Sequence, residues 1–426
     1  MGVVKKFVQS IHQKPVSKHY IAFARQQKGW QQSFALLPDV WKEVIGVHTD
    51  SYATPNSFVA PKRRIESLGL LNALFADIDD HVNKFRFASV LYFLQKDYFG
   101  SRVPWPNTVV ETGRGMHLYW FIEPLTPDKL PLWQLAQNLI LDALSDITDY
   151  FPSGNVEVDK KVKDATRLLR LPGTVNSATN TIVNLYEYST ERYNIEEIIT
   201  EYFPSINYTK TLKKGQASKK PKKSSLTKLF NTYTLHNARL IDVAKLQELR
   251  RGFCRVGGKL VPTGQRELMC FLYRYYSCLF LQDEEEALRQ TLEFNQGFVE
   301  PLTEKEVVSA TRSAEKAFQE WQETGRGKYN YRNATLIELL GILPEEQREL
   351  KTIISTEEKY RRNNERRQKK RRDSMGMTKR EREKAETVAK VKELKEQGLT
   401  QGEIAKKLGI TQQYVSKIFK DIKKYN

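Results

Sequence analysis

Cysteine is scarce in this chain, and the few cysteines present are not spaced for a shared site. Cys254, Cys270 and Cys278 include no CxxC pair, which argues against a cysteine-ligated zinc site or a disulfide framework. No stretch approaches the roughly 18 consecutive apolar residues that a membrane-spanning helix needs. The first residues, MGVVKKFVQSIHQKP, hold no continuous apolar segment, so we expect no secretory signal and no membrane partner, but a cytoplasmic protein.

A GxxxxGK[ST] phosphate-binding loop is also absent, which excludes a recognisable P-loop helicase. What the sequence has in excess is positive charge. Of 426 residues, 69 are Lys or Arg and 51 are Asp or Glu, which leaves a net charge of +18. Residues 1–210 carry about +1, residues 211–350 carry +5 and residues 351–426 carry +12. Nucleic acid is the default partner for so basic a chain.

Two basic runs divide the sequence into three parts. Residues 210–223 contain seven Lys and no acid, and residues 361–372 contain a single Glu. Neither run has an apolar period, so both are interpreted as solvated linkers or arms. Contact with phosphates, without readout of base sequence, is the alternative interpretation. The resulting segments are 1–209, a Lys-rich linker at 210–228, 229–345, a basic linker at 346–380, and 381–426.

The segment 71–79, LNALFADID, predicts a strand whose last residues alternate between apolar and acidic side chains. Side chains two residues apart on a strand share a face, so Asp77 and Asp79 project together. Adjacent carboxylates repel each other unless a cation relieves the repulsion, and Mg²⁺ uses one or two carboxylates together with substrate phosphates. The alternative is a polar exit from the strand, in which Asp79 or Asp80 caps a turn.

Residues 108–122, TVVETGRGMHLYWFI, predict a β-hairpin. Gly113 and Gly115 can adopt the positive φ of a tight turn, and backbone N–H groups there can approach a phosphate closely. His117 follows the turn, where its ring can donate to a phosphate oxygen. The alternative is a half-buried histidine that is satisfied by a backbone carbonyl.

Residues 155–176 form a third block. The alternation of NVEVD places Asp159 on the polar face of a strand, and Arg167 and Arg170 follow before the stop signal LPGT. Planar guanidinium groups suit a triphosphate. The alternative for Arg167 is a structural ion pair with Asp164, one helical turn earlier.

Together these blocks resemble the motifs of the archaeo-eukaryotic primase (primase–polymerase) superfamily, in its plasmid and phage form. That family carries a hydrophobic strand ending in Asp-x-Asp and a small-residue turn leading to His. Its third motif, later in the chain, is an Asp that follows a hydrophobic residue. The matching stretches here are LFADID, TGRGMH and VEVD, and DATRLLRLPGTVN is similar to the segment after the third motif. The resemblance covers roughly residues 60–185. It implies an α/β (α+β) catalytic core with an RRM-like sheet within residues 1–209.

The resemblance also implies roles for the matched residues. Asp77, Asp79 and Asp159 would hold two divalent ions, Mg²⁺ or Mn²⁺, with Asp164 as the alternative third ligand. His117 would contact the phosphates of an incoming NTP or dNTP. The other members of the implied nucleotide-binding set are Gly113, Arg114, Gly115, Arg167 and Arg170. The implied reaction is nucleotidyl transfer onto a DNA-templated primer.

Residues 229–345 predict an all-α domain. The stretch RELMCFLYRYYSCLFLQ carries a broad apolar stripe, and Thr303 with Glu306 predicts a capping box before a later helix. The order GQRELM, PLTEKEV and RSA resembles the helical domain that follows the catalytic module in many plasmid and phage primases. That domain is associated with primer synthesis, template handling or partner contact, and we expect no chemistry from its residues.

Residues 381–426 predict three short helices. Thr400 with Glu403 opens the second, and Gly409 ends it. A helix, a tight turn and a helix form a helix-turn-helix, and TQGEIAKKLGITQQYVSKIFK resembles such domains in resolvases, sigma factors and plasmid regulators. The third helix would enter the major groove. The residues expected to face bases or phosphates are Thr411, Gln412, Gln413, Ser416, Lys417 and Lys420.

These expectations describe a primase or polymerase that initiates replication of a bacterial plasmid or other mobile element. Its partners would be single-stranded template, a double-stranded origin and nucleotides, with a host replication helicase or polymerase as a further candidate. One alternative is a non-catalytic initiator that only binds DNA. A rolling-circle nickase is disfavoured because MHLYW holds one His rather than a pair. A plain transcription regulator would leave the N-terminal half unexplained.

Overall fold

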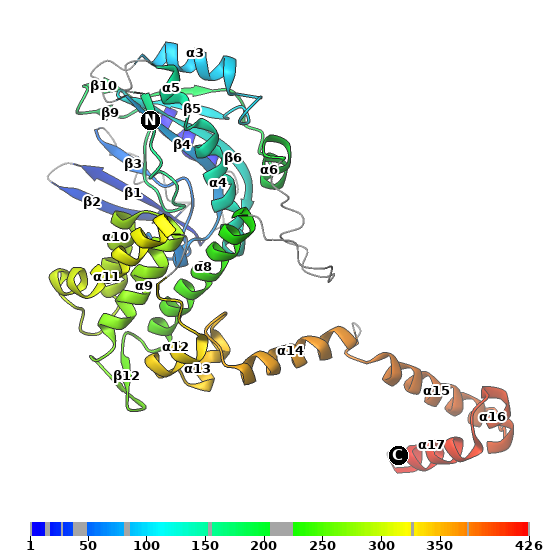
Figure 1. The fold of residues 1–426 in the computed structure, drawn as a ribbon. Helices are drawn as coiled ribbons and strands as arrows, with labels where there is room; N and C mark the ends of the chain where they lie inside the picture. The colour runs from blue at the N-terminus through cyan, green and yellow to red at the C-terminus, as the bar shows by residue number, and fades with distance from the viewer. Residues whose placement is uncertain are drawn as a thin grey trace. The chain divides into compact units, whose positions relative to one another are not determined.

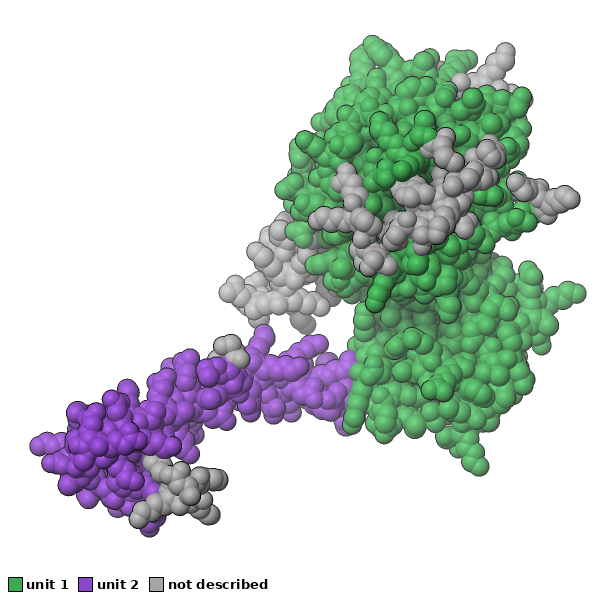
Figure 2. Space-filling view, turned by 180° about the vertical axis from the view of Figure 1, so that it is seen from behind, with its two compact units in different colours: residues 1–353 green, residues 354–426 purple. Residues whose placement is uncertain are grey.

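The computed structural model divides the chain into two compact units, residues 1–353 and residues 354–426 (Figures 1 and 2). The structure describes residues 2–12, 18–26, 29–36, 49–80, 86–151, 156–204, 225–324, 328–372 and 375–424. The Lys-rich run at 210–223 lies outside these residues. Within them, no helix is both long enough and apolar enough to cross a bilayer.

The first unit contains a five-stranded antiparallel sheet in the order β11-β5-β6-β4-β7. In that order, its strands are Asn184–Glu187, Thr108–Glu111, Gly115–Leu125, Leu71–Asp80 and Val156–Val158. Helix α3 (Phe87–Asp97) follows β4, and α4 (Leu130–Leu144) follows β6. The resulting β-α-β-β-α-β sequence, with β4 and β6 at the centre, confirms the RRM-like sheet.

The strand pairing in this sheet follows from the hydrophobic pattern. β4 is buried on both faces at its start, and α4 packs against it, with the Trp133 ring nitrogen donating to the Ala73 carbonyl at 2.9 Å. Gln137, also on α4, accepts from the N–H of Phe75 and donates to its carbonyl. The predicted hairpin is confirmed, because β5 and β6 pair in antiparallel register around the glycine turn.

A second, four-stranded sheet has the order β2-β1-β3-β8. Its strands, in that order, are Trp30–Leu36, Tyr20–Gln26, Ser51–Ala53 and Leu169–Arg170. The remaining elements of this α/β part are α1 (Gly2–Ile11), η2 (Ile65–Ser67), η3 (Pro127–Lys129), α5 (Ile147–Tyr150), β9 (Val175–Asn176), β10 (Thr181–Ile182) and α6 (Ile195–Tyr202). The last strand, β8, comes from the segment after the third motif, so that segment joins the two sheets.

The rest of the first unit is helical, as the sequence predicted. Its helices are α8 (Ser225–Leu249), α9 (Arg266–Leu281), α10 (Glu284–Asn295), α11 (Glu304–Thr324), α12 (Asn333–Leu340) and α13 (Pro344–Glu349). Helix α9 is the central helix of this region and packs against α8, α10 and α11. The capping box is confirmed, because the Thr303 N–H donates to the Glu306 carboxylate and the Glu306 N–H donates to the Thr303 hydroxyl.

The expectation of an all-α region was wrong in one place. A small hairpin joins β12 (Cys254–Val256) to β13 (Lys259–Val261) between α8 and α9. Gly257 and Gly258 both have positive φ, which is the backbone that a two-residue hairpin turn requires.

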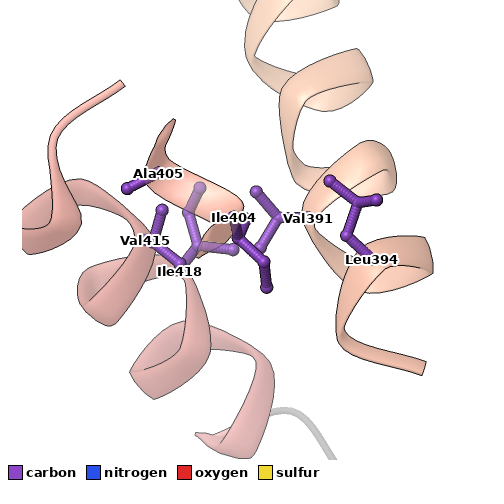
Figure 3. Close-up of a cluster of buried hydrophobic side chains, with 6 residues drawn as sticks. All are labelled: Val391, Leu394, Ile404, Ala405, Val415 and Ile418. Atoms are coloured by element: carbon purple, nitrogen blue, oxygen red, sulfur yellow. The ribbon is translucent and has the colours of Figure 1, made fainter. Parts of the chain in front are cut away.

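The second unit contains α14 (Thr356–Arg371), α15 (Lys379–Glu396), α16 (Gln401–Leu408) and α17 (Gln412–Lys424). Figure 3 shows the small core that the last three helices share: Val391, Leu394, Ile404, Ala405, Val415 and Ile418. A capping box at Thr400 opens α16, and Gly409, with a φ of 64°, ends it. The predicted helix-turn-helix is confirmed.

Helix α14 lies within the segment interpreted as a solvated basic linker or arm. The Ser355 hydroxyl accepts from the Glu358 N–H, which caps the helix at its start. Glu358 then pairs with Arg361 at 2.6 Å and with Arg362 at 2.7 Å. Such pairs, together with basic residues in the last turn, stabilise a helix that has no apolar stripe.

Candidate functional site

The three predicted carboxylates lie around one cavity. Asp77 and Asp79 are alternate residues of β4, and Asp159 directly follows β7, the neighbouring strand. The N–H of Asp159 donates to the carbonyl of Asp77 at 2.9 Å. All three residues line a cavity of about 280 Å³. The pairing of β4 with β7 therefore brings together acids that are far apart in the sequence.

His117 lies opposite Asp77 on the paired strand β6. Its Nε2 is 3.5 Å from Asp77 Oδ2, and its Nδ1 is 3.5 Å from the Tyr119 hydroxyl. Burial raises the pKa of Tyr119 well above its usual range, and the charge of Asp77 adds to this, so the hydroxyl keeps its proton. The Tyr119 hydroxyl can therefore donate to Nδ1, while Nε2 faces the carboxylate of Asp77.

The glycine turn before β6 is sterically fixed. A Cβ on Gly115 would lie 2.1 Å from the Ile78 carbonyl oxygen and 3.0 Å from Asp79 Oδ1, so only glycine fits this position. Gly113 has a φ of 96°, in the left-handed region. Between them, the Arg114 side chain lines the cavity, and its carbonyl accepts from the N–H of Asp80. The predicted part of these amides in phosphate binding stays a prediction.

Arg170 reaches the cavity from β8, but its guanidinium is already engaged. It donates to Asp50 Oδ1 at 2.6 Å and to the Tyr52 hydroxyl at 2.7 Å. Partial burial acts to raise the pKa of Asp50, but hydrogen bonds from Ser177 and Arg170 lower it further than burial raises it. Asp50 therefore remains a carboxylate that holds Arg170 in place at the cavity wall.

Arg167 lines the cavity and also pairs with Asp164, at 3.5 Å between Nε and Oδ2. The predicted ion pair is confirmed, but the predicted helix was wrong. Residues 164–167 form a turn, because the N–H and the hydroxyl of Thr166 both donate to Asp164 Oδ1. Asp164 is fully buried and is not part of the cavity wall, whereas Asp159 is.

Sequence reasoning missed several residues of the same cavity. Tyr52 comes from β3, and Asn176 from β9, where its side chain donates to the Thr112 carbonyl at 2.7 Å. Asp50, the partner of Arg170, adopts a positive φ of 41°. Asn176 ends the stretch DATRLLRLPGTVN but was assigned no role, whereas Asp50 and Tyr52 belong to no period or motif of the sequence.

The donor set of the cavity is suited to a divalent cation. Carboxylate oxygens are the ligands that Mg²⁺ and Mn²⁺ prefer. Among them, Asp77 Oδ1 is buried and has no hydrogen-bond partner. In the described part of the chain, however, no three His, Cys, Asp or Glu side chains are positioned as a ready-made metal cage. The side chains of Asp77, Asp79 and Asp159 would therefore have to draw closer together around an ion.

The second unit presents a polar face on α17. Gln412, Gln413, Lys417 and Lys420 are exposed, opposite the buried Val415 and Ile418, and Ser416 is half-buried. Thr411 is also exposed, and its hydroxyl accepts from the Tyr414 N–H at the start of the helix. The predicted contact residues thus share one exposed side, and their contact with DNA stays a prediction.

The fold defines an α/β protein with a helical region and an attached helix-turn-helix. Residues 391–424 match the family model described as helix-turn-helix, an arrangement that supports DNA binding. The chain is 36% identical over 355 residues to a protein of Clostridium perfringens named "Replication protein". The aligned residues cover 82% of this chain and 79% of the relative. This chain belongs to that family of replication proteins.

Two solved structures are also similar to the chain. The AEP domain of the cyanophage S-2L primase-polymerase aligns with 47% of this chain and 96% of its own, at 15% identity and a TM-score of 0.33. The primase RepB′ aligns with 75% of this chain and 99% of its own, at 12% identity and a TM-score of 0.30.

Proposed function

We propose that this replication protein is a template-directed nucleotidyltransferase, a primase or DNA polymerase that serves a plasmid or other mobile element. The observation that carries the proposal is the convergence of Asp77, Asp79 and Asp159 with His117 in one cavity. Carboxylates held in this way by a rigid sheet are suited to bind ions and phosphates together.

The three carboxylates would hold two divalent ions at the cavity wall. When bound, such ions supply charge neutralisation for the phosphates and for the 3′ oxygen of the primer. The protein supplies the scaffold, because Asp77 and Asp79 project from one face of a fully paired strand. The buried Oδ1 of Asp77, which has no hydrogen-bond partner, would gain a favourable contact from a cation.

The nucleotide would be oriented by the cationic and proton-donating side of the cavity. Burial acts to lower the pKa of Arg167, but the nearby charge of Asp164 raises it further, so the guanidinium stays positive. Arg167 and Arg114 would bind the triphosphate of an NTP or dNTP. His117 would donate from Nε2 to a phosphate oxygen, in place of its present contact with Asp77. Positioning and charge are the main contributions in this chemistry.

The helix-turn-helix would bring this activity to an origin. Gln413 can pair with adenine in the major groove, and Lys417 and Lys420 can bind phosphates beside it. The basic character of the C-terminal segment adds affinity for any DNA. A host replication helicase or polymerase is a further partner in this proposal.

Combined replacement of two site carboxylates tests the catalytic assignment. The purified protein is incubated with single-stranded template and labelled ATP or dATP, with Mg²⁺ or Mn²⁺ in separate reactions. We expect metal-dependent synthesis by the wild type and a loss of about a thousandfold or more in Asp77→Ala with Asp79→Ala, because charge stabilisation worth several kcal/mol is removed. Glu123→Ala is the control, since Glu123 is an exposed carboxylate on β6 outside the cavity.

An unchanged rate in the double variant would show that the catalytic assignment is wrong. A wild-type protein that is inactive under every condition but still binds origin DNA would favour the non-catalytic initiator instead.

A further inference from the structure

An exposed tryptophan and a half-buried tyrosine lie side by side next to the cavity. Trp30 begins β2 and is 51% exposed, and Tyr52 lies in β3 and lines the cavity. The two ring centroids are 5.2 Å apart and the ring planes are inclined by 46°. A tryptophan in this position leaves a large apolar face in water, which a planar ligand would cover.

The register of the four-stranded sheet places these rings on one face. Gln26 of β1 pairs with Trp30, and Ala24 of β1 pairs with Tyr52. Because residues two apart on a strand share a face, both rings project to the same side of the sheet. Arg170 of β8 pairs with Tyr52 in turn, and its guanidinium carbon lies 4.7 Å from the centre of the tyrosine ring.

The three side chains form a row that leads from the sheet edge to the cavity. β2 is an edge strand of its sheet, so Trp30 stands at the outer end, and both Tyr52 and Arg170 line the cavity at the inner end. Asp50 holds the Arg170 guanidinium and thereby fixes the inner end of the row. A ligand with its phosphates among the site arginines would extend a planar group along these rings.

We propose that Trp30 and Tyr52 form a stacking platform for a nucleobase, carried by the incoming nucleotide or by the template strand. The inference rests on the proposed function, since it takes the cavity to bind the phosphates of nucleic acid or nucleotide. Every base presents a π face, so the platform accepts all four bases without reading their sequence. Its contribution is affinity and orientation.

Binding measurements on the full chain test the platform without requiring synthesis. The probes are a short labelled oligothymidylate, followed by fluorescence anisotropy, and dTTP, followed by calorimetry. We expect Trp30→Ala to raise the Kd for one of the two probes about tenfold, and Trp30→Phe to retain most of the affinity. Trp105→Ala is the matched control, because Trp105 is 43% exposed and is not part of the cavity wall.

The pattern of change identifies the source of the base. A weaker oligothymidylate complex assigns the platform to the template strand, and a weaker dTTP complex assigns it to the incoming nucleotide; either result supports the inference. Unchanged affinities for both probes in Trp30→Ala overturn it, as does a wild-type protein that binds neither probe. If Trp30→Ala weakens binding while the wild type synthesises nothing, the catalytic proposal falls and the platform stands. If the wild type synthesises and Trp30→Ala binds normally, the platform alone falls.

Discussion

The carboxylates of the cavity differ in how their oxygens are satisfied. Asp159 Oδ1 accepts from the N–H of Lys161 at 2.8 Å, whereas Asp77 Oδ1 is buried and has no hydrogen-bond partner. A buried carboxylate oxygen without a partner costs free energy unless a donor or cation reaches it. Asp77 therefore has an unsatisfied carboxylate oxygen, which a bound ion would satisfy.

Conservative substitutions distinguish the two candidates for the third carboxylate. Asp159→Asn removes a charge from the cavity wall without changing the side-chain volume, and we expect the rate at saturating nucleotide to fall about a hundredfold or more. Asp164→Asn leaves the cavity acids in place but removes the counter-ion of Arg167, so we expect a raised KM and a mostly retained kcat. Steady-state kinetics, with thermal unfolding as a check on folding, would contradict the assignment if the two variants exchanged these effects.

Strand alternation indicated which face each of four cavity residues occupies, and the resemblance to the primase–polymerase motifs implied that they share one site. Asp77, Asp79, Asp159 and His117 each follow a readable apolar pattern, and the structure brings them together. Tyr52 of β3 and the preceding Asp50 could not be predicted, because β3 is only three residues long and pairs with β1 and β8 across long stretches of chain. Arg170 was predicted as a phosphate ligand, but its fixed ion pair with Asp50 depends on this distant pairing.

At the scale of elements, α10 is tied to the α/β part through a buried charge cluster. Glu286 of α10 pairs with Arg289 at 2.7 Å and lies 3.6 Å from Arg63. Arg63 also donates to the Thr166 carbonyl, in the turn that holds Arg167. The turn that carries a cavity arginine is thus supported by a helix from the segment predicted as a separate domain.

Removal of the Glu286 carboxylate is expected to be costly. Glu286→Ala leaves Arg63 and Arg289 buried without this partner, and we expect it to lower the free energy of unfolding by about 3 kcal/mol. Glu293→Ala, which removes a more exposed partner of Arg289 alone, should cost under about 1 kcal/mol. Urea unfolding at neutral pH measures both, and equal effects of the two variants would contradict this view of the cluster.

The same variant should show a defined pH dependence. Burial acts to raise the pKa of Glu286, but the charges of Arg289 and Arg63 lower it to about 2, against an ordinary value of 4.5. The folded protein therefore keeps this carboxylate charged where the unfolded chain is already protonated. Its stabilising contribution is present above about pH 4.5 and is lost as the pH falls toward 2, so wild type and Glu286→Ala should converge in acid.

Helix α14 shows the limit of periodicity at the scale of elements. Its sequence has no apolar stripe, and its stabilising contacts are a cap at Ser355 and ion pairs around Glu358. Pattern reasoning looks for a buried face, so it missed a helix that is held mainly by charge. The helix-turn-helix, in contrast, could be predicted from capping residues and core spacing together.

At the scale of the whole molecule, most of the net positive charge lies outside the unit that holds the acidic cavity. Residues 354–426 carry +11 of the total +18, whereas the acids of the cavity lie in the first unit. The sequence predicted this separation, because the charge count needs no structure. It did not predict that residues 1–353 form one compact unit, because that depends on contacts such as those of Arg63 and Glu286.

Deletion of residues 381–426 is expected to separate targeting from synthesis. The shortened protein should lose its preference for origin DNA but retain untargeted synthesis on single-stranded template.

Origin binding by the full chain should weaken steeply between about 50 and 200 mM salt, because bound Lys and Arg release counterions from DNA. Gln413→Ala with Lys417→Ala, two exposed positions on α17, should reproduce the loss of preference in gel-shift measurements. Continued selection of the same site by the shortened protein would place specificity elsewhere.

The most direct measurement is incorporation of labelled nucleotide on single-stranded DNA, by the wild type and by Asp77→Ala with Asp79→Ala, with and without a divalent ion. If the cavity is catalytic, products appear only with the wild type and only when Mg²⁺ or Mn²⁺ is supplied. Equal incorporation by the double variant, or incorporation that persists after the metal is chelated, would contradict the account.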